Sequence, residues 1–288
     1  MTDGQKLPTP EELKQEYPMT PELREIKERR DKEIADIITG DSGKLLLVIG
    51  PCSADHEDPV LKYTHWLSVQ QEAYKDKFVI VPRVYTGKPR TNSKGYKGIS
   101  THPGVTGRPN LAEGLRKMRQ LQIDVIRETG LTAADEMLNP FNLPYVDDML
   151  SYHAIGARSV GDQSHREFPS SLDVAVGMKN PESGDLSVMM HAIDAAQSPQ
   201  SINYDGKQKD THGNPLSHAI LRGARNQYGR SIPNYHYEDL KRVISMYNDG
   251  FSHLRNPAII VDCNHDNSGK DYREQSRIAQ QVLFYRNE

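Results

Sequence analysis

Short apolar runs alternate with helix-like stretches from residue 41 onward. The apolar runs predict strands at Lys44–Ile49, Phe78–Val84, Thr132–Met137, Ala154–Arg158, Val174–Lys179, Ser217–Leu221 and Ala258–Val261. The stretches between them predict helices at Pro59–Ala73, Leu111–Thr129, Pro144–Ser151, Ser187–Ala196 and Tyr237–Asn248, with a last one from about Lys270 to Tyr285. Strands that are apolar throughout and alternate with helices are typical of a parallel sheet buried on both faces. We therefore expect one α/β domain over residues 41–288.

The first 40 residues have a different pattern. Thr9-Pro10 and Thr20-Pro21 each place a capping hydroxyl before a proline, which is favoured at the first position of a helix. The apolar positions of the second of these helices are sparse and end at Gly40. We expect an N-terminal helical extension over residues 1–40 that packs against the α/β domain or a neighbouring subunit.

Composition excludes several classes of function. Lys and Arg number 36 against 39 for Asp and Glu, a net charge of −3, so general attraction to nucleic acid or anionic lipid is not expected. The longest strictly apolar run, Leu45–Ile49, is far shorter than the roughly 20 residues that span a bilayer. Two cysteines form no disulfide framework, and the N-terminus resembles no secretory signal. We expect a cytoplasmic protein without nucleic-acid or membrane partners.

Each predicted strand has a charged or reactive residue at or just past its carboxyl end. In chain order these are Gly50-Pro51-Cys52-Ser53, Arg83, Glu136, Arg158, Lys179, Arg222 and His265. A single arginine at such a position is often part of a surface ion pair. Seven in register indicate the active-site face of a (β/α) barrel, which the loops after the strands build.

The segment Thr86–Asn110 is longer than a connection requires and has only basic charges. No acidic residue occurs between Asp76 and Glu113, and the cations in this interval include Arg83, Lys88, Arg90, Lys94, Lys97 and Arg108. Glycines in the same segment allow the backbone to approach a ligand closely. A local cationic loop on a mildly acidic protein indicates small anionic substrates, above all phosphates.

Cys52 and His265 each have two interpretations. Taken singly, Cys52 fits a small buried residue and His265 fits a hydrogen-bonded histidine. At strand ends of one barrel, a thiolate and an imidazole also fit one divalent transition metal. Both interpretations remain open from the residues alone.

Seven motifs stand in an order that resembles a known family. They are Ile49-Gly50-Pro51-Cys52-Ser53, Lys88-Pro89-Arg90-Thr91, Gly156-Ala157-Arg158-Ser159, Gln163-Ser164-His165-Arg166-Glu167, Val176-Gly177-Met178-Lys179-Asn180, His218-Ala219-Ile220-Leu221-Arg222-Gly223 and Asn264-His265-Asp266-Asn267-Ser268. From about residue 10 to 288 the chain resembles the class I alpha, microbial type of 3-deoxy-D-arabino-heptulosonate 7-phosphate (DAHP) synthase. The related 3-deoxy-octulosonate 8-phosphate synthases have Lys-Ala-Asn-Arg where this chain has Lys88-Pro89-Arg90-Thr91, which disfavours another acceptor sugar.

The resemblance implies a transferase that condenses phosphoenolpyruvate with erythrose 4-phosphate in the first step of the shikimate pathway. By analogy, Arg83, Arg158, Lys179 and Arg222 bind phosphoenolpyruvate, with Glu136 nearby. Lys88 reaches both substrates and is a candidate for proton transfer, although phosphate binding alone also explains it. Arg90 and Thr91 bind the sugar phosphate. Cys52 and His265 ligate a divalent metal such as manganese, iron, cobalt or zinc.

The chain departs from the family pattern after His265. The family has eight barrel strands, and its last part supplies a metal-ligating Glu and, in a Gly-Lys-Ser-Ile-Thr-Asp segment, a metal-ligating Asp. Neither matches any segment here, so we expect a TIM (β/α)8-type barrel that is incomplete at the C-terminus, with seven strands. Three explanations stay open: a fragment of a longer chain, closing elements supplied by another chain, or a phosphoenolpyruvate-binding relative that has lost catalysis.

The resemblance also implies regulation and assembly. Many members of the family bind an aromatic amino acid as feedback inhibitor, in regions comparable to those of Pro144, Ser170 and Ser171. A homo-oligomer is expected, because the N-terminal helices and the long segment Pro199–Pro215 need a surface to pack on.

Overall fold

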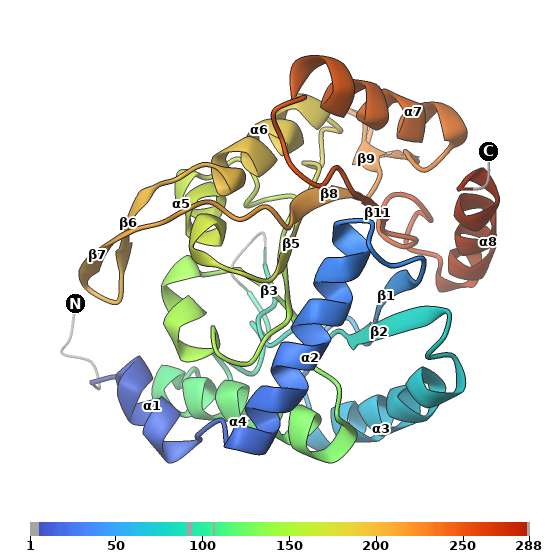
Figure 1. Ribbon diagram of the computed structural model, residues 1–288. Coiled ribbons are helices and arrows are strands. Elements are labelled where there is room, and N and C mark those ends of the chain that lie inside the picture. Colours follow the sequence, from blue (N-terminus) through green and yellow to red (C-terminus); the bar gives the residue numbers. More distant parts are fainter. Residues whose placement is uncertain (1–5, 91–93, 106, 287–288) are drawn as a thin grey trace. The chain divides into compact units, whose positions relative to one another are not determined.

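The computed structural model describes residues 6–90, 94–105 and 107–286. The chain divides into two compact units. Figure 1 labels the helices and strands of both. Unit 1 comprises residues 1–153 and 203–207, and unit 2 comprises residues 154–202 and 208–288. In the described part of the chain, no helix combines the length and apolar character that crossing a membrane requires.

The N-terminal segment forms the two expected helices, α1 (Pro10–Glu16) and α2 (Pro21–Ile38). Thr9 caps α1 through a capping box with Glu12, and the Thr20 hydroxyl caps α2. Their apolar positions belong to the core of unit 1, in which Leu13, Met19 and Leu23 pack with residues of α4 (Leu111–Thr129).

Unit 1 has three short strands: β1 (Leu45–Ile49), β2 (Phe78–Pro82) and β3 (Ala134–Glu136). β1 and β2 pair in parallel, with Leu45 opposite Phe78 and Ile49 opposite Pro82. Two further helices of this unit, α3 (Glu57–Ala73) and α4, contact each other (Figure 1). α4 begins at the Asn110 cap and ends at Gly130, whose φ of 67° is a conformation that glycine adopts without strain.

Unit 2 is built around a buried parallel sheet. β8 (Ser217–Leu221) lies between β5 (Ala175–Lys179) and β11 (Ile259–Val261) and pairs in parallel with both. All residues of β5 and β8 are buried, as expected for apolar runs covered on both faces. β4 (Tyr152–Ile155) spans the division between the units.

The remaining elements of unit 2 are helices and small hairpins. The helical ones are α5 (Gln163–Glu167), η2 (Phe168–Ser171), α6 (Leu186–Gln197), α7 (Tyr237–Ser245), η3 (Met246–Gly250), η4 (Tyr272–Glu274) and α8 (Gln275–Tyr285). β9 (Ala224–Arg225) and β10 (Ser231–Ile232) form an antiparallel pair after β8.

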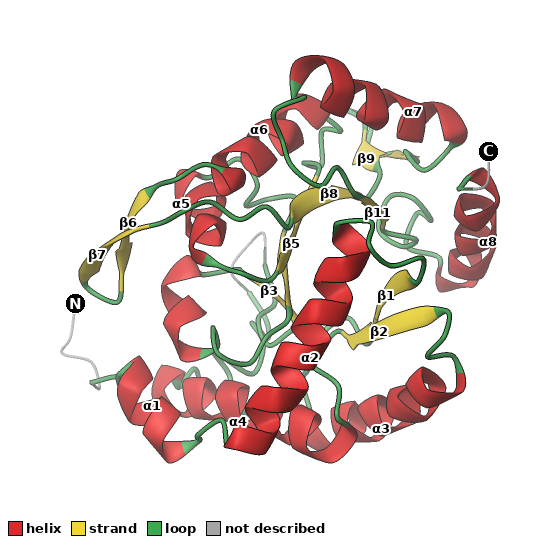
Figure 2. Cartoon of the chain, viewed as in Figure 1, coloured by secondary structure: helices red, strands yellow, loops and turns green. Residues whose placement is uncertain are grey.

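Three sequence predictions differ from the structure. The helix predicted over Pro144–Ser151 is instead a short 3-10 helix, η1 (Pro140–Tyr145), followed by turns; Pro144 lies inside η1, where it has no backbone N–H to donate. The strand predicted at Ala154–Arg158 is β4, which ends at Ile155. The long segment Pro199–Pro215, in which no strand is predicted, contains β6 (Ser201–Tyr204) and β7 (Lys207–Asp210), yellow in Figure 2.

Candidate functional site

The loop after β1 is tightly packed against Arg83, the residue after β2. A Cβ atom at Gly50 would lie 2.7 Å from the carbonyl oxygen of Arg83 and 2.9 Å from its Cβ, so only glycine fits this position. The following Cys52 is exposed, and its Sγ lies 3.6 Å from Nζ of Lys88. The same ammonium donates a hydrogen bond of 3.3 Å to the hydroxyl of Ser53. Unit 1 therefore brings Cys52 and Lys88 together.

The cationic loop is folded back on itself. Lys88 N–H donates to the carbonyl of Lys97 at 2.9 Å, and Ser100 N–H donates to the carbonyl of Thr86 at 3.1 Å. Gly98 has a φ of 95°, and a Cβ there would lie 2.2 Å from the Thr86 oxygen. These contacts hold the backbone around Lys88 against the backbone around Lys97.

Arg90 is exposed on this loop, and its Nε donates a hydrogen bond of 2.7 Å to the carbonyl oxygen of Tyr96. Thr91, the second residue predicted to bind the sugar phosphate, lies outside the described residues. The guanidinium of Arg83 lies over the ring of Tyr85, with 4.2 Å from Cζ to the ring centre.

A buried carboxyl lies under the start of the cationic loop. Asp135 accepts hydrogen bonds from the N–H of Thr86 at 3.0 Å, from its hydroxyl at 2.5 Å, and from Glu136 N–H at 2.7 Å. Burial raises the pKa of Asp135 to about 7, against the opposing effect of these hydrogen bonds. Sequence reasoning selected Glu136 and missed Asp135, although an acidic residue inside an apolar strand was a visible signal.

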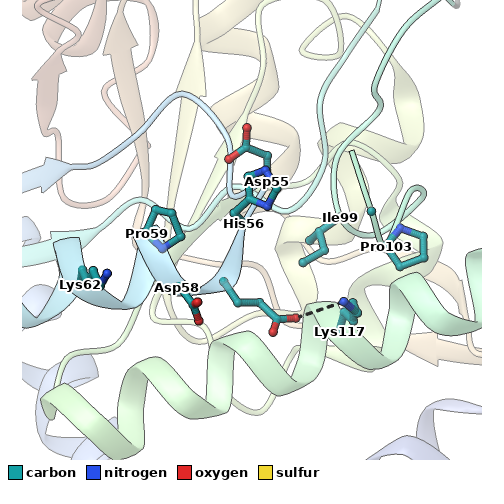
Figure 3. A pocket seen from close by; sticks show the side chains of 10 residues that line it. Asp55, His56, Asp58, Pro59, Lys62, Ile99, Pro103 and Lys117 are labelled. Carbon is teal, nitrogen blue, oxygen red and sulfur yellow. Dashed lines mark ion pairs between the residues drawn. The ribbon is translucent and has the colours of Figure 1, made fainter. Parts of the chain in front are cut away.

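A pocket of about 490 Å³ lies beside the same loop, at the start of α3 (Figure 3). Asp55, Glu57 and Asp58 line it together with apolar groups such as Ile99 and Pro103. Lys117 also lines the pocket, and its Nζ lies 3.7 Å from Oε1 of Glu57, so this cation is already paired with a carboxylate. Three carboxylates repel a phosphate, and none of the predicted site residues lines this pocket. We therefore do not assign it to the phosphorylated substrates.

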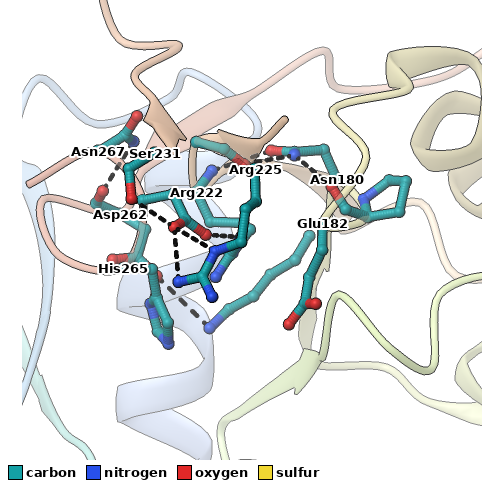
Figure 4. A network of polar contacts seen from close by, with 12 residues as sticks. Asn180, Glu182, Arg222, Arg225, Ser231, Asp262, His265 and Asn267 are labelled. Carbon is teal, nitrogen blue, oxygen red and sulfur yellow. Dashed lines mark hydrogen bonds and ion pairs between the residues drawn. The ribbon is translucent and has the colours of Figure 1, made fainter. Parts of the chain in front are cut away.

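Unit 2 places two buried cations at the ends of neighbouring parallel strands (Figure 4). Lys179 ends β5, and its Nζ lies 3.5 Å from Oδ2 of Asp262. Arg222 follows β8 and donates to Asp266 from Nη1. Arg158 differs, since its side chain is half-exposed and lies 3.4 Å from Glu182. It follows the strand by three residues because β4 ends at Ile155.

His265 is held by the same carboxylate that pairs with Lys179. Its Nδ1 lies 2.7 Å from Oδ2 of Asp262, and its φ of 41° is unusual for a residue other than glycine. Burial alone raises the pKa of Asp262, but Lys179 and His265 together hold it well below its usual range. An ionised Asp262 that accepts from Nδ1 leaves Nε2 of His265 as the nitrogen for a ligand.

The donor chemistry of Cys52 and His265 fits a transition metal. A histidine oriented by a carboxylate is the usual arrangement of an imidazole ligand, and sulfur with nitrogen favours such metals over magnesium. Among the described residues, no group of three or more His, Cys, Asp or Glu side chains is placed to hold a metal ion. The other cysteine, Cys263, is partly buried, and burial, aided by Asp262, raises the pKa of its thiol to about 11.

Unit 2 has buried cations at the ends of two neighbouring parallel strands and an oriented imidazole. Unit 1 has an exposed thiol and a cationic loop. These are features of an α/β enzyme that acts on phosphorylated substrates. The family model described as the DAHP synthetase I family matches residues 16–283. The chain belongs to this family, whose members are enzymes of the first step of aromatic amino acid biosynthesis.

Characterised relatives agree with this membership. The chain is 37% identical over 289 residues to the Tyr-sensitive phospho-2-dehydro-3-deoxyheptonate aldolase of Escherichia coli K12, covering 98% of this chain and 78% of that protein. It is 38% identical over 275 residues to the phospho-2-dehydro-3-deoxyheptonate aldolase of Haemophilus influenzae, covering 94% and 73%. The solved structure of the aldolase of that name from Francisella tularensis SCHU S4 has a TM-score of 0.90 at 30% identity, covering 99% of this chain and 82% of the other.

Proposed function

We propose that this chain condenses phosphoenolpyruvate with erythrose 4-phosphate to give 3-deoxy-D-arabino-heptulosonate 7-phosphate and inorganic phosphate. Membership of the family supports this reaction. The structural observation that carries it is the placement of Lys179 and Arg222, which are buried side by side at the ends of parallel strands. Buried cations at such a position suit a small, strongly anionic substrate.

Phosphoenolpyruvate has a phosphate and a carboxylate, and we assign Arg83, Arg158, Lys179 and Arg222 to them. Arg222 presents a planar guanidinium that matches the geometry of either anion, and Lys179 supplies a point charge. The charges also stabilise the phosphate as it leaves. Glu136 is assigned a place near the same substrate.

Erythrose 4-phosphate is assigned to the cationic loop. Arg90 and Thr91 take its phosphate, and Lys88 lies between the two substrates. The support for Arg90 is its exposed guanidinium, which Tyr96 fixes through Nε so that its Nη donors can meet a phosphate.

The bond-forming step joins C3 of phosphoenolpyruvate to the aldehyde carbon of the sugar. The aldehyde oxygen becomes a hydroxyl by taking a proton, for which Lys88 is the candidate donor. Water then adds to C2, and phosphate leaves from the same carbon. Lys88 is close to Cys52 and Ser53, which fixes its ammonium near the end of β1.

We propose a divalent metal, one of manganese, iron, cobalt or zinc, as the cofactor, with Cys52 and His265 among its ligands. When bound, such an ion supplies Lewis acidity that polarises the aldehyde carbonyl. Cys52 and His265 hold the ion, while Asp262 fixes the ring of His265 through Nδ1.

Three broader properties are part of the proposal. The strands belong to a (β/α) barrel over residues 41–288, extended by the helices of residues 1–40. The protein is a cytoplasmic homo-oligomer. An aromatic amino acid regulates it, since relatives are named Tyr-sensitive and Trp-sensitive; Pro144, Ser170 and Ser171 lie in the comparable regions. Adding Phe, Tyr and Trp singly to an assay tests the last property.

The test of the reaction is phosphate release by the purified chain from phosphoenolpyruvate and erythrose 4-phosphate. Manganese is added in one sample and a chelator in another, and arabinose 5-phosphate replaces erythrose 4-phosphate in a third. We expect metal-dependent turnover with erythrose 4-phosphate only. Binding of phosphoenolpyruvate without turnover would favour the alternative, a catalytically impaired relative or fragment.

A further inference from the structure

The carboxylate of Asp266, in the loop after β11, contacts two arginines and a serine, Arg222, Arg225 and Ser231, which Figure 4 labels. Oδ2 of Asp266 accepts a hydrogen bond from Nη1 of Arg222. Its Oδ1 accepts one from the Ser231 hydroxyl at 2.7 Å, and Arg225 donates to the same oxygen from Nε and Nη2 at 3.4 and 3.3 Å. The side chains of Asp266 and Arg222 are 2% and 5% exposed, so this ion pair is shielded from water.

The backbone fixes Asp266 relative to Arg222. Asp266 N–H donates to the carbonyl of Arg222 at 3.2 Å, and the side chain of Asn267 donates to the Leu221 carbonyl at 3.1 Å. Gly223 has a φ of 78°, and a Cβ there would lie 2.5 Å from the carbonyl carbon of Asp266. The loop is therefore pressed against the end of β8.

The β9–β10 hairpin supplies the other partners of this carboxylate. Arg225 lies on β9 and Ser231 on β10, so closing the hairpin brings both onto Oδ1 of Asp266. Asp266 engages only Nη1 of Arg222, and the Nε and Nη2 donors of Arg222 take no part in this ion pair. A guanidinium fixed through one nitrogen presents the rest of its fork in one orientation.

We propose that Asp266 is a positioning residue for phosphoenolpyruvate. It holds the guanidinium of Arg222 in the orientation that receives the substrate's anionic groups, while Arg225 and Ser231 of the β9–β10 hairpin hold Asp266. This inference rests on the proposed function, because the role of Arg222 is part of it. The same loop carries Asp262 and His265, so one segment aligns both buried cations and the proposed metal ligand.

The test is Asp266→Asn in the full chain, with the KM of each substrate measured separately. The amide keeps the size of the carboxylate and removes its charge. We expect the KM for phosphoenolpyruvate to rise about tenfold, the scale of a lost hydrogen bond to a charged group. The KM for erythrose 4-phosphate and kcat should change far less. The inhibition constant of inorganic phosphate should rise in parallel with the KM for phosphoenolpyruvate.

Two further variants make the test independent of folding. Ser231→Ala removes one partner of Asp266 and should raise the KM for phosphoenolpyruvate by about threefold, consistent with a neutral hydrogen bond. Asp249→Asn, at an exposed position of unit 2, removes the same charge and should leave both KM values unchanged. Should Asp266→Asn fail to fold, Ser231→Ala decides the question.

A purely structural role would lower kcat or the folded fraction and leave the KM ratio as it is, and that result would overturn the inference. Calorimetry with phosphoenolpyruvate alone tests the positioning role of Asp266 separately from the proposed reaction. If the wild-type chain binds phosphoenolpyruvate without turnover, weaker binding by Asp266→Asn still supports the positioning role, and equal binding overturns it. A wild-type chain that does not bind phosphoenolpyruvate overturns both.

Discussion

The imidazole of His265 is tied to Asp262 through Nδ1, at 2.7 Å from Oδ2. The same oxygen lies 3.5 Å from Nζ of Lys179, so one buried carboxylate fixes both a cation and a histidine. Such a carboxylate sets the tautomer of the ring and makes the other nitrogen the metal-binding one. The left-handed φ of His265 shows that the surrounding loop imposes the position of this ring.

Asp262→Asn should weaken metal binding by about 10- to 100-fold, as is usual for the loss of a carboxylate that orients a histidine ligand. The amide keeps the size of the side chain but no longer provides the charge that Lys179 and the ring share. Titration with cobalt, followed by its absorption, measures the affinity without any need for turnover. Asp249→Asn serves as the charge-matched control. Equal cobalt affinity in wild type and Asp262→Asn would contradict the assignment of His265.

Cys52→Ala should abolish metal-dependent activity and leave the fold intact, because Cys52 is exposed and contributes no core packing. Cys263→Ala is the matched control: its thiol, whose pKa burial raises to about 11, stays protonated and donates towards the carbonyl of Val261. Activity with added manganese and circular dichroism are measured for both variants. Full activity of Cys52→Ala would refute its role as a ligand.

Arg90→Ala should raise the KM for erythrose 4-phosphate by about tenfold and that for phosphoenolpyruvate by much less, as expected for losing a charged hydrogen bond to one substrate. Arg108→Ala removes an exposed cation near the end of the same long segment and should change neither KM to that extent. Steady-state kinetics with each substrate varied in turn provides the comparison. Equal effects of Arg90→Ala on both substrates would reject the division of the cations between them.

The repeated pattern of the chain made most of the fold predictable. Continuous apolar runs located β1, β2, β5, β8 and β11 within one or two residues, since such strands are short and bounded by glycines or charges. β4 was misplaced because it begins with Tyr152 and His153, whose polar atoms hide a buried strand in the pattern. The strands β9 and β10 have two residues each, too few to show a pattern of apolar and polar positions in the sequence.

The cations of the candidate site could be predicted from the sequence, but the carboxylates that pair with them could not. Lys179, Arg222 and His265 stand out because they follow apolar runs. Asp262 and Asp266 are two of many acidic residues in polar segments, and only the folded loop shows that each contacts a cation. Asp135 was visible as an acidic residue inside an apolar strand, but Glu136, at the end of that strand, was selected in its place. An ion pair between segments that are far apart in the chain has no characteristic spacing by which the sequence could reveal it.

Asp135 should make the stability of the fold fall as pH rises. Its pKa is about 7 in the folded chain against an ordinary 3.8, so between these values the folded state holds a proton that the unfolded state has released. The free energy of unfolding should therefore decrease from about pH 4 to about pH 7 and then level off, with a slope of at most about 1.4 kcal/mol per pH unit from this group. In the neutral form, the carboxyl is buried under Thr86 without the cost of a charge.

Asp135→Asn should remove this contribution, because an amide does not titrate and keeps an oxygen for the N–H groups of Thr86 and Glu136. Urea unfolding at pH 5, 6, 7 and 8 measures the difference. The variant should resemble the wild type at pH 5 and be the more stable of the two at pH 8, where the wild type buries a carboxylate. Asp76→Asn, at an exposed turn before β2, should show no such crossover. A variant that is less stable than wild type by the same amount at every pH would mean that Asp135 acts through its hydrogen bonds alone.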